Sequence, residues 1–248
     1  MNDLEKIFYS NKGAKIHKWK HYFEIYDRHF QKYRNKEIVI LEIGVFQGGS
    51  LQMWKEYFGN NAKIYGLDIN PECKKLESEG IEILIGSQQD RAFLRKLKTI
   101  IPKVDILIED GGHTMKQQIT TFEELYEHVK DDGVYLCEDL HTSYWENFGG
   151  GYKSRGTFIE YSKNFIDYIN AWHSKQIALR INNFTKSTFA IHYYDSIIVL
   201  EKRRMKKPQD LSTGNDTLPP YNPKRSWFDL FLAVCRGLRN KIRTITRL

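Results

Sequence analysis

Two short apolar runs, residues 104–109 and 133–137, are each followed directly by carboxylate side chains. Runs of this kind are typical of buried parallel strands, whose carboxyl ends open onto a crevice. If the two strands are neighbours, three acids converge with a histidine beside them: Asp110, Glu138, Asp139 and His113. Three carboxylates suit Mg²⁺ or a similar divalent cation, and His113 is placed like a general base. The sequence therefore predicts a metal site at one edge of a sheet.

Each of these assignments has an alternative. Acids at strand ends can cap loops or face a lysine, which explains one such pair readily but three acids poorly. His113 could instead hydrogen-bond a turn. His141, two residues after the acid pair, is a competing base, although we favour a substrate or supporting contact for it. We expect Glu109 and Cys137 to be structural.

A glycine-containing turn, residues 44–49, follows the first predicted strand and opens a helix. Its spacing, Gly-x-x-x-Gly-Gly, differs from that of dinucleotide-binding loops, and a tight turn without a ligand is an alternative. Asp68 ends the next strand, where it could accept hydrogen bonds from a ribose. An acid at residue 42 disfavours phosphate and favours a cationic nucleoside, a description that S-adenosylmethionine fits. The predicted cofactor contacts here are Glu42, Gly44, Gly48, Ser50 and Asp68.

The third predicted strand ends in polar residues that complete this cofactor site. Ser87 and Gln88 are placed to meet an adenine ring, whereas we expect Asp90 to cap the next helix. Asp110, at the end of the fourth strand, is counted both as a cofactor contact and as a metal ligand.

Strands and helices alternate along most of the chain. A helix over 18–35 precedes strands at 37–45, 62–68, 81–86, 104–109 and 133–138, with helices at about 50–58, 88–99 and 115–129 between them. Residues 157–174 look helical, and strands at 187–193 and 196–203 form a hairpin. The prediction is a Rossmann-like α/β fold of the class I methyltransferase layout: a seven-stranded, mostly parallel sheet ending in an antiparallel hairpin.

The composition of the chain changes after the hairpin. Residues 208–223 hold four of the six prolines, which is typical of an exposed linker. Beyond it, Ser226 could cap an amphipathic helix that carries arginines opposite an apolar face. The predicted organisation has four parts: an N-terminal helical cap at 1–36, a catalytic domain at 37–205, a linker at 206–225 and a basic helix at 226–248.

Charge and cysteine content restrict the partners. The net charge is +7 in 248 residues, but residues 224–248 contribute +6 of it, so the body gives no reason to expect a nucleic-acid partner. An arginine-rich amphipathic helix suits an anionic membrane surface, and docking on the catalytic domain or on a sister subunit is an equal alternative. Three scattered cysteines and a charged start lead us to expect a cytoplasmic protein, peripheral to the inner face of the plasma membrane if the helix binds lipid.

With these residues in view, the chain resembles the sugar O-methyltransferases of macrolide biosynthesis, of the macrocin and mycinamicin type, and related cephalosporin-hydroxylase-type proteins. The resemblance covers about residues 10–203, and its most specific segments are 41–45, 110–113, 118–122, 138–145 and 149–151. It implies Mg²⁺ bound by Asp110, Glu138 and Asp139, with His113 as base. It also implies that Tyr22 lies in a segment covering the cofactor. Ser87 and Gly112 depart from residues frequent in relatives.

The sequence thus predicts metal-assisted transfer of a methyl group from S-adenosylmethionine to a sugar or glycan hydroxyl, in surface polysaccharide or glycosylated natural product biosynthesis. The acceptor could be free, nucleotide-linked, lipid-linked or polymeric. Hydroxylation is an alternative, but the sequence shows no two-histidine-one-carboxylate iron triad. A nucleoside-binding protein without catalysis is a further alternative. Whether the chain forms a homo-oligomer is left open.

Overall fold

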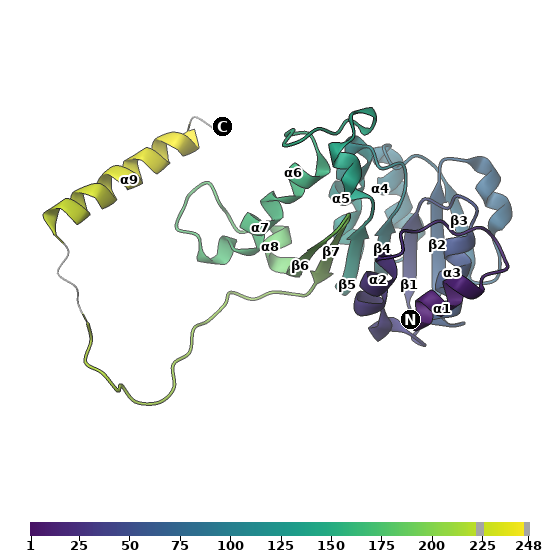
Figure 1. Cartoon of the computed structure of the whole chain (residues 1–248), viewed down its shortest axis with the longest axis horizontal. Coiled ribbons are helices and arrows are strands. Elements are labelled where there is room, and N and C mark those ends of the chain that lie inside the picture. The colour runs from purple at the N-terminus through teal and green to yellow at the C-terminus, as the bar shows by residue number, and fades with distance from the viewer. Residues whose placement is uncertain (222–225, 246–248) are drawn as a thin grey trace.

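A seven-stranded sheet lies at the centre of the molecule (Figure 1). The computed structural model describes residues 1–221 and 226–245. The sheet order is β3-β2-β1-β4-β5-β7-β6; β1 to β5 are parallel, and β7 is antiparallel to both of its neighbours. The strands are β1 (Val39–Ile43), β2 (Lys63–Asp68), β3 (Ile81–Ile85), β4 (Val104–Glu109), β5 (Val129–Cys137), β6 (Thr188–Tyr194) and β7 (Ile197–Lys202). This topology confirms the predicted Rossmann-like layout.

Helices cover both faces of the sheet and bury two apolar cores. One core packs β-strand residues such as Ile40 and Ile108 against α1 (Asp3–Ser10), α2 (Tyr22–Phe30) and α3 (Gly49–Phe58). The other packs Leu41 and Leu107 against α4 (Arg91–Ile100), α5 (Met115–Leu125), α6 (Phe158–Ser162), α7 (Asn164–Ile169) and α8 (Asn183–Ser187). Because both faces are buried, the central strands are apolar on every side, as parallel strands require.

Three predicted helices differ from the structure. The helix expected over 18–35 begins only at Tyr22 and ends in a 3₁₀ turn, so Trp19 lies outside it. Residues 157–174 form α6, α7 and a 3₁₀ turn instead of one helix. The helix at 115–129 likewise ends at Leu125 and continues as a 3₁₀ turn. Helical periodicity predicted the burial of Phe23, Tyr26 and Phe30 correctly, but not the exposure of Trp19 or where the helices begin and end.

The segment before α2 has a reason to stay extended. Residues 11–21, here called the N-terminal strap, cross the glycine-containing turn at the start of α3. A Cβ atom on Gly49 would lie 2.4 Å from the Lys15 carbonyl oxygen and 2.5 Å from that of Ala14. Only glycine permits this close backbone approach, so the turn and the strap require one another.

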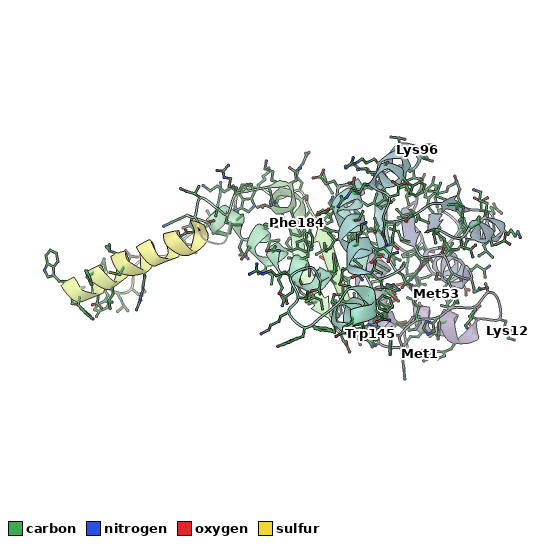
Figure 2. The ribbon with its side chains drawn as sticks, turned by 90° about the horizontal axis from the view of Figure 1, so that it is seen from above. Met1, Lys12, Met53, Lys96, Trp145 and Phe184 are labelled. Atoms are coloured by element: carbon green, nitrogen blue, oxygen red, sulfur yellow. The ribbon has the colours of Figure 1, made fainter. Side chains whose placement is uncertain are left out.

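The chain continues from β7 into a linker and a separate helix, α9 (Trp227–Ile245), which stands apart from the domain (Figures 1 and 2). The described linker residues, 203–221, contain no helix or strand. The Ser226 hydroxyl accepts a hydrogen bond from the Asp229 amide at 3.1 Å, as predicted for a helix cap. Residues 222–225 and 246–248, which include Lys224, Arg225 and Arg247, lie outside the described part. None of the described helices is long and apolar enough to cross a membrane.

Candidate active site

The predicted acids do converge, at the carboxyl ends of three adjacent strands. Glu42 lies in β1, Asp110 follows β4, and Glu138 and Asp139 follow β5. Hydrogen bonds between adjacent strands hold these residues level with one another at the edge of the sheet. The Asp110 amide donates to the Ile43 carbonyl, and the Glu138 amide donates to the Glu109 carbonyl, both at 2.9 Å. In an open parallel sheet this edge is where ligands bind, because helices leave a crevice there.

A lysine that the sequence analysis did not single out lies in the middle of these acids. Lys18, on the N-terminal strap, has only 2% of its side chain exposed. Its ammonium donates to Asp110 Oδ2 and to both oxygens of Glu138, at 3.0 and 2.9 Å, and is 3.7 Å from Glu42 Oε1. The strap therefore supplies one cation to an otherwise anionic cluster.

Burial perturbs the pKa values of these groups. Desolvation raises the pKa of Glu42 to about 7, against the lowering effect of Lys18. Desolvation and the nearby Asp110 also raise the pKa of Glu138 well above its usual value. Burial by itself would lower the pKa of Lys18, but Asp110 and Glu138 together keep it above its usual value. Carboxylates crowded in a buried site disfavour ionisation, and a cation relieves that cost.

Two residues of the cluster are held in a strained backbone conformation. His113 has a φ of 54° and Asp139 a φ of 55°, which non-glycine residues seldom adopt. As a result His113 Nε2 lies 3.7 Å from Asp110 Oδ1 and 3.5 Å from Asp139 Oδ2. Such strain costs about 1–3 kcal/mol per residue and is concentrated at functional sites.

The two tyrosines of α2 complete the acid cluster. Tyr22 donates a hydrogen bond to Asp139 at 2.7 Å, and Tyr26 donates one to Glu138 at 2.7 Å. Helical spacing marked Tyr26 only as a core residue. The residue type could have indicated a polar contact for Tyr26, since a buried tyrosine hydroxyl usually has a polar partner. Nothing in the sequence indicated in the same way that Lys18 would be buried among the acids.

The competing base, His141, faces elsewhere. Its Nδ1 contacts the Ser196 hydroxyl, and its ring lies between those of Trp19 and Trp145, with centroids 5.7 and 4.6 Å away. Of the two candidate histidines, only His113 lies against the carboxylates.

A pocket of about 450 Å³ lies beside the cluster, over the carboxyl ends of β1, β2 and β3. Asp68 accepts backbone hydrogen bonds from Val45 and Phe46 there, at 2.9 and 3.2 Å. Gln88, largely buried, donates to Glu109 at 2.7 Å and accepts from the Gly112 amide at 2.8 Å. The predicted cofactor residues that line this pocket are Gly44, Asp68, Ser87, Gln88 and Asp110.

Other predicted cofactor contacts lie outside that pocket. Glu42 is fully buried behind the site, where it accepts hydrogen bonds from Ser50 at 3.0 Å and from Trp54 at 3.1 Å. Gly48 caps the start of α3 without lining the pocket. Tyr22 lines the neighbouring acidic pocket instead. Cofactor contacts therefore stay predictions for four residues: Tyr22, Glu42, Gly48 and Ser50.

The acidic pocket has a volume of about 230 Å³ and adjoins the first one. Phe46, Asp110 and Gly111 line both pockets. Its remaining walls come from the strap, from α2 and from the strand ends: His17, Lys18, Trp19, Tyr22, His113, Glu138 and Asp139. Two ligands could therefore bind side by side with Asp110 between them.

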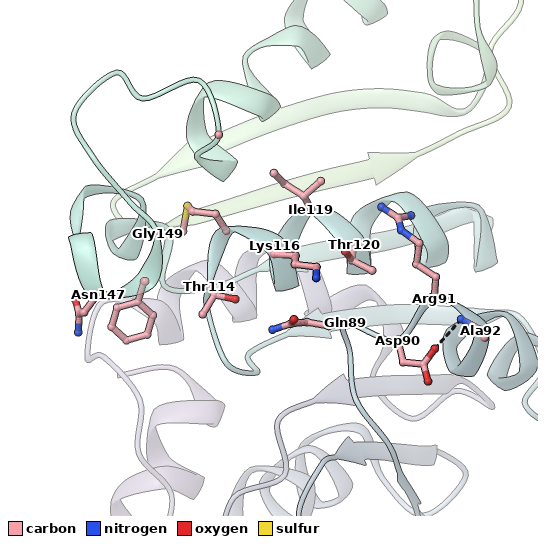
Figure 3. A pocket seen from close by; sticks show the side chains of 13 residues that line it. Gln89, Asp90, Arg91, Ala92, Thr114, Lys116, Ile119, Thr120, Asn147 and Gly149 are labelled. Atoms are coloured by element: carbon pink, nitrogen blue, oxygen red, sulfur yellow. Dashed lines mark hydrogen bonds between the residues drawn. The ribbon is translucent and has the colours of Figure 1, made fainter.

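A larger, more open groove of about 930 Å³ lies next to the starts of α4 and α5 (Figure 3). Gln89, Thr114 and Lys116 line it, while Asp90 caps α4 by accepting from the Ala92 amide at 2.9 Å, as predicted. The groove contains none of the predicted cofactor or metal residues. Its size therefore does not make it the reaction centre, because the convergent acids and the histidine lie elsewhere.

The acid cluster fits a divalent cation. Oxygens of Asp110 and Asp139 and a ring nitrogen of His113 all lie within 4.8 Å of one another. The His113 nitrogen that faces these acids is Nε2, whereas Glu138, outside this group, accepts from Lys18 with both carboxylate oxygens and from Tyr26 with one of them. Carboxylate oxygens are the ligands that Mg²⁺ prefers. Lys18 supplies only one positive charge to the four carboxyl groups, so the cluster retains anionic charge for a metal ion.

Comparison with known proteins agrees with the fold. Residues 41–140 match a family described as a methyltransferase domain. The chain is 33% identical to demethylmacrocin O-methyltransferase of Streptomyces fradiae, over 82% of this chain and 53% of that protein. It is also 33% identical to mycinamicin VI 2''-O-methyltransferase of Micromonospora griseorubida, over 82% of this chain and 53% of the relative.

Solved structures give the same result. The MycE methyltransferase from the mycinamycin pathway, in complex with Mg, SAH and mycinamycin VI, superimposes with a TM-score of 0.71 at 30% identity, covering 94% of this chain and 58% of that one. The fold and the matched domain place the chain among the Rossmann-like methyltransferases. Its relatives include the macrocin, mycinamicin and tetracenomycin sugar O-methyltransferases. The chain spans about half the length of these relatives.

Replacing Lys18 by methionine tests its electrostatic role. The substitution keeps the volume but leaves buried carboxylates without their cation, so we expect unfolding free energy to fall by about 3 kcal/mol. Mg²⁺ should recover more stability in this variant than in the parent protein, because the divalent ion then supplies the missing charge. Urea unfolding with and without Mg²⁺ measures both effects. Exposed Lys20→Met is the control, and equal losses in the two variants would contradict the assignment.

The raised pKa of Glu42 predicts a pH dependence. In the unfolded chain this group ionises near 4.5, but in the folded protein only near 7, so the folded state binds more protons between these values. Stability contributed by protonated Glu42 is therefore lost as pH rises from about 4.5 to 7, by about 3 kcal/mol. Urea unfolding across this range should show a flatter profile for Glu42→Gln; parallel profiles for the two proteins would refute the prediction.

Proposed function

We propose that this protein transfers the methyl group of S-adenosylmethionine to a hydroxyl of a sugar, with the help of a divalent cation. The observation that carries the proposal is the pair of adjoining pockets with Asp110 in their shared wall. A cofactor bound in the pocket of about 450 Å³ would present its sulfonium methyl group toward the acidic pocket, where the acceptor hydroxyl would lie against His113. The names of the relatives, which methylate sugars of macrolides and of a tetracenomycin, support a sugar acceptor.

The chain's own residues divide the work. Gly44 and Asp68 bind and orient the cofactor, while Tyr22 and Tyr26 fix the carboxylates of Asp139 and Glu138 by hydrogen bonds. Asp110, Glu138 and Asp139 would hold the cation, which lowers the pKa of a coordinated hydroxyl. His113 Nε2 accepts the proton that the hydroxyl loses. Alignment of the resulting oxygen with the methyl group supplies much of the remaining rate enhancement.

Methyl transfer to a panel of sugar glycosides tests this function. We expect transfer that a chelator abolishes and added Mg²⁺ restores. His113→Gln should lower kcat by about 100-fold or more while cofactor affinity, measured by calorimetry, stays unchanged, because His113 lines only the acidic pocket. His141→Gln is the matched control and should change kcat little. The opposite ranking would make His141 the base, and transfer that is insensitive to the chelator would remove the metal from the mechanism.

We further propose that α9 brings the enzyme to an anionic membrane surface, at the inner face of the plasma membrane, where a lipid-linked glycan would be its acceptor. Trp227, Phe228, Phe231 and Val234 are all exposed on the first turns of α9, without packing on the domain. Basic residues follow them in the sequence. Apolar side chains beside arginines are the composition of helices that lie in the membrane interface.

Vesicle sedimentation tests the membrane proposal. Full-length protein should sediment with vesicles containing phosphatidylglycerol and not with phosphatidylcholine alone. A Trp227→Ser, Phe231→Ser double variant should lose at least about tenfold in partitioning, because each removed side chain contributes apolar burial. Leu218→Ser, an exposed apolar residue of the linker, is the control. Equal partitioning of the parent protein and both variants would contradict the proposal. Self-association without vesicle binding would also contradict it, and would show that α9 packs against a second copy of the chain.

A further inference from the structure

A second cluster of ligating side chains lies away from the active site. His29 on α2, His192 on β6 and Glu201 on β7 each bring one ligand atom within 4.8 Å of the other two. These residues are 163 and 9 positions apart in the chain, which is why spacing gave no sign of them. The sequence alone therefore could not show that two histidines and a carboxylate meet here.

The sheet register explains why two of them meet. His192 pairs with Val199 and Ala190 pairs with Glu201 across the β6–β7 hairpin. His192 and Glu201 are thus diagonal neighbours on one face, which is within reach for long side chains. α2 packs on that same face through the core that contains Val199, and so it carries His29 to the pair.

One of the two nitrogen–oxygen distances matches an edge of a small coordination polyhedron. His192 Nε2 lies 3.4 Å from Glu201 Oε1, whereas His29 Nδ1 lies 2.9 Å from the same oxygen, a hydrogen-bond distance that would have to widen around an ion. Ligand atoms about 2.0–2.1 Å from a tetrahedral ion are about 3.3–3.4 Å apart. The two rings lie with their centroids 4.7 Å apart.

One nitrogen of the cluster is not satisfied by hydrogen bonding. His192 Nε2 is buried and, among the described residues, has no hydrogen-bond partner, although it points toward Glu201. Buried polar nitrogens are rarely left without a partner. An ion between the three side chains would satisfy it.

The remaining contacts suit a metal ligand as well. His29 is 2% exposed, and its other nitrogen, Nε2, lies 2.9 Å from the Tyr194 hydroxyl. Histidines that bind metals normally have such a partner on the second ring nitrogen, which fixes the ring orientation. Two imidazoles and one carboxylate favour Zn²⁺ or a similar transition-metal ion over Mg²⁺.

We propose that His29, His192 and Glu201 bind a Zn²⁺-type ion that joins α2 to the β6–β7 hairpin. None of these residues lines the two pockets of the active site, so the ion has a structural role. Its effect reaches the active site through α2, because Tyr22 and Tyr26 lie seven and three residues before His29 and therefore on the same side of the helix.

Cobalt spectroscopy on full-length protein tests the proposal. The protein is first stripped with a chelator and then titrated with Co²⁺ in excess Mg²⁺, which occupies the acidic cluster. We expect a stoichiometric visible absorption typical of tetrahedral Co²⁺, displaced by Zn²⁺, and a higher melting temperature with Zn²⁺.

Matched variants locate the ion. His192→Gln and Glu201→Gln should each weaken Co²⁺ binding by more than about tenfold, whereas exposed His173→Gln and the active-site variant Asp139→Asn should retain the spectrum. Circular dichroism confirms that the variants are folded. A spectrum unaffected by both ligand substitutions, or no tetrahedral spectrum in the parent protein, would overturn the proposal. If a ligand variant unfolds, the Asp139→Asn variant is used instead, because it lacks a proposed ligand of the acidic cluster but keeps His29, His192 and Glu201. Zn²⁺ must raise the melting temperature of this variant, and failure to do so would contradict the site.

Discussion

The active site depends on one electrostatic constraint: carboxyl groups crowded at a buried sheet edge need a cation. Glu42, Asp110 and Glu138 all lie within 4 Å of the Lys18 ammonium, which itself is almost fully buried. Breaking a buried ion pair costs several kcal/mol because a charge is left without compensation. The strap meets this requirement with Lys18, and α2 adds hydrogen bonds from Tyr22 and Tyr26 to Asp139 and Glu138.

The same requirement connects the strap to the cofactor pocket. The strap that carries Lys18 also crosses the glycine turn, which Gly49 permits by having no side chain. Phe46, on that turn, lines both pockets, so the strap, the turn and the acids form a continuous wall. The strained backbones of His113 and Asp139 are maintained by this packed surrounding. Cofactor pocket and acid cluster are therefore parts of one structure.

The sequence predicted what repeats locally and missed what depends on tertiary contact. Alternating apolar runs gave all seven strands, and acids at strand ends gave the convergence of Asp110, Glu138 and Asp139. Lys18 could not be predicted, because a lysine in a polar segment gives no sign that it will be buried. His29, His192 and Glu201 meet only through packing of α2 on the hairpin, and the start of α2 at Tyr22, later than predicted, depends on the strap.

The central claim is that cofactor and cation lie side by side with Asp110 between them. Nuclear magnetic resonance of S-adenosylmethionine carrying a ¹³C-labelled methyl group, with Mn²⁺ in place of Mg²⁺, tests it directly. Paramagnetic broadening falls steeply with distance. We expect strong broadening of the methyl resonance in the parent protein and its loss in an Asp110→Asn, Asp139→Asn double variant that still binds cofactor. A sharp methyl resonance with both ligands bound would contradict it.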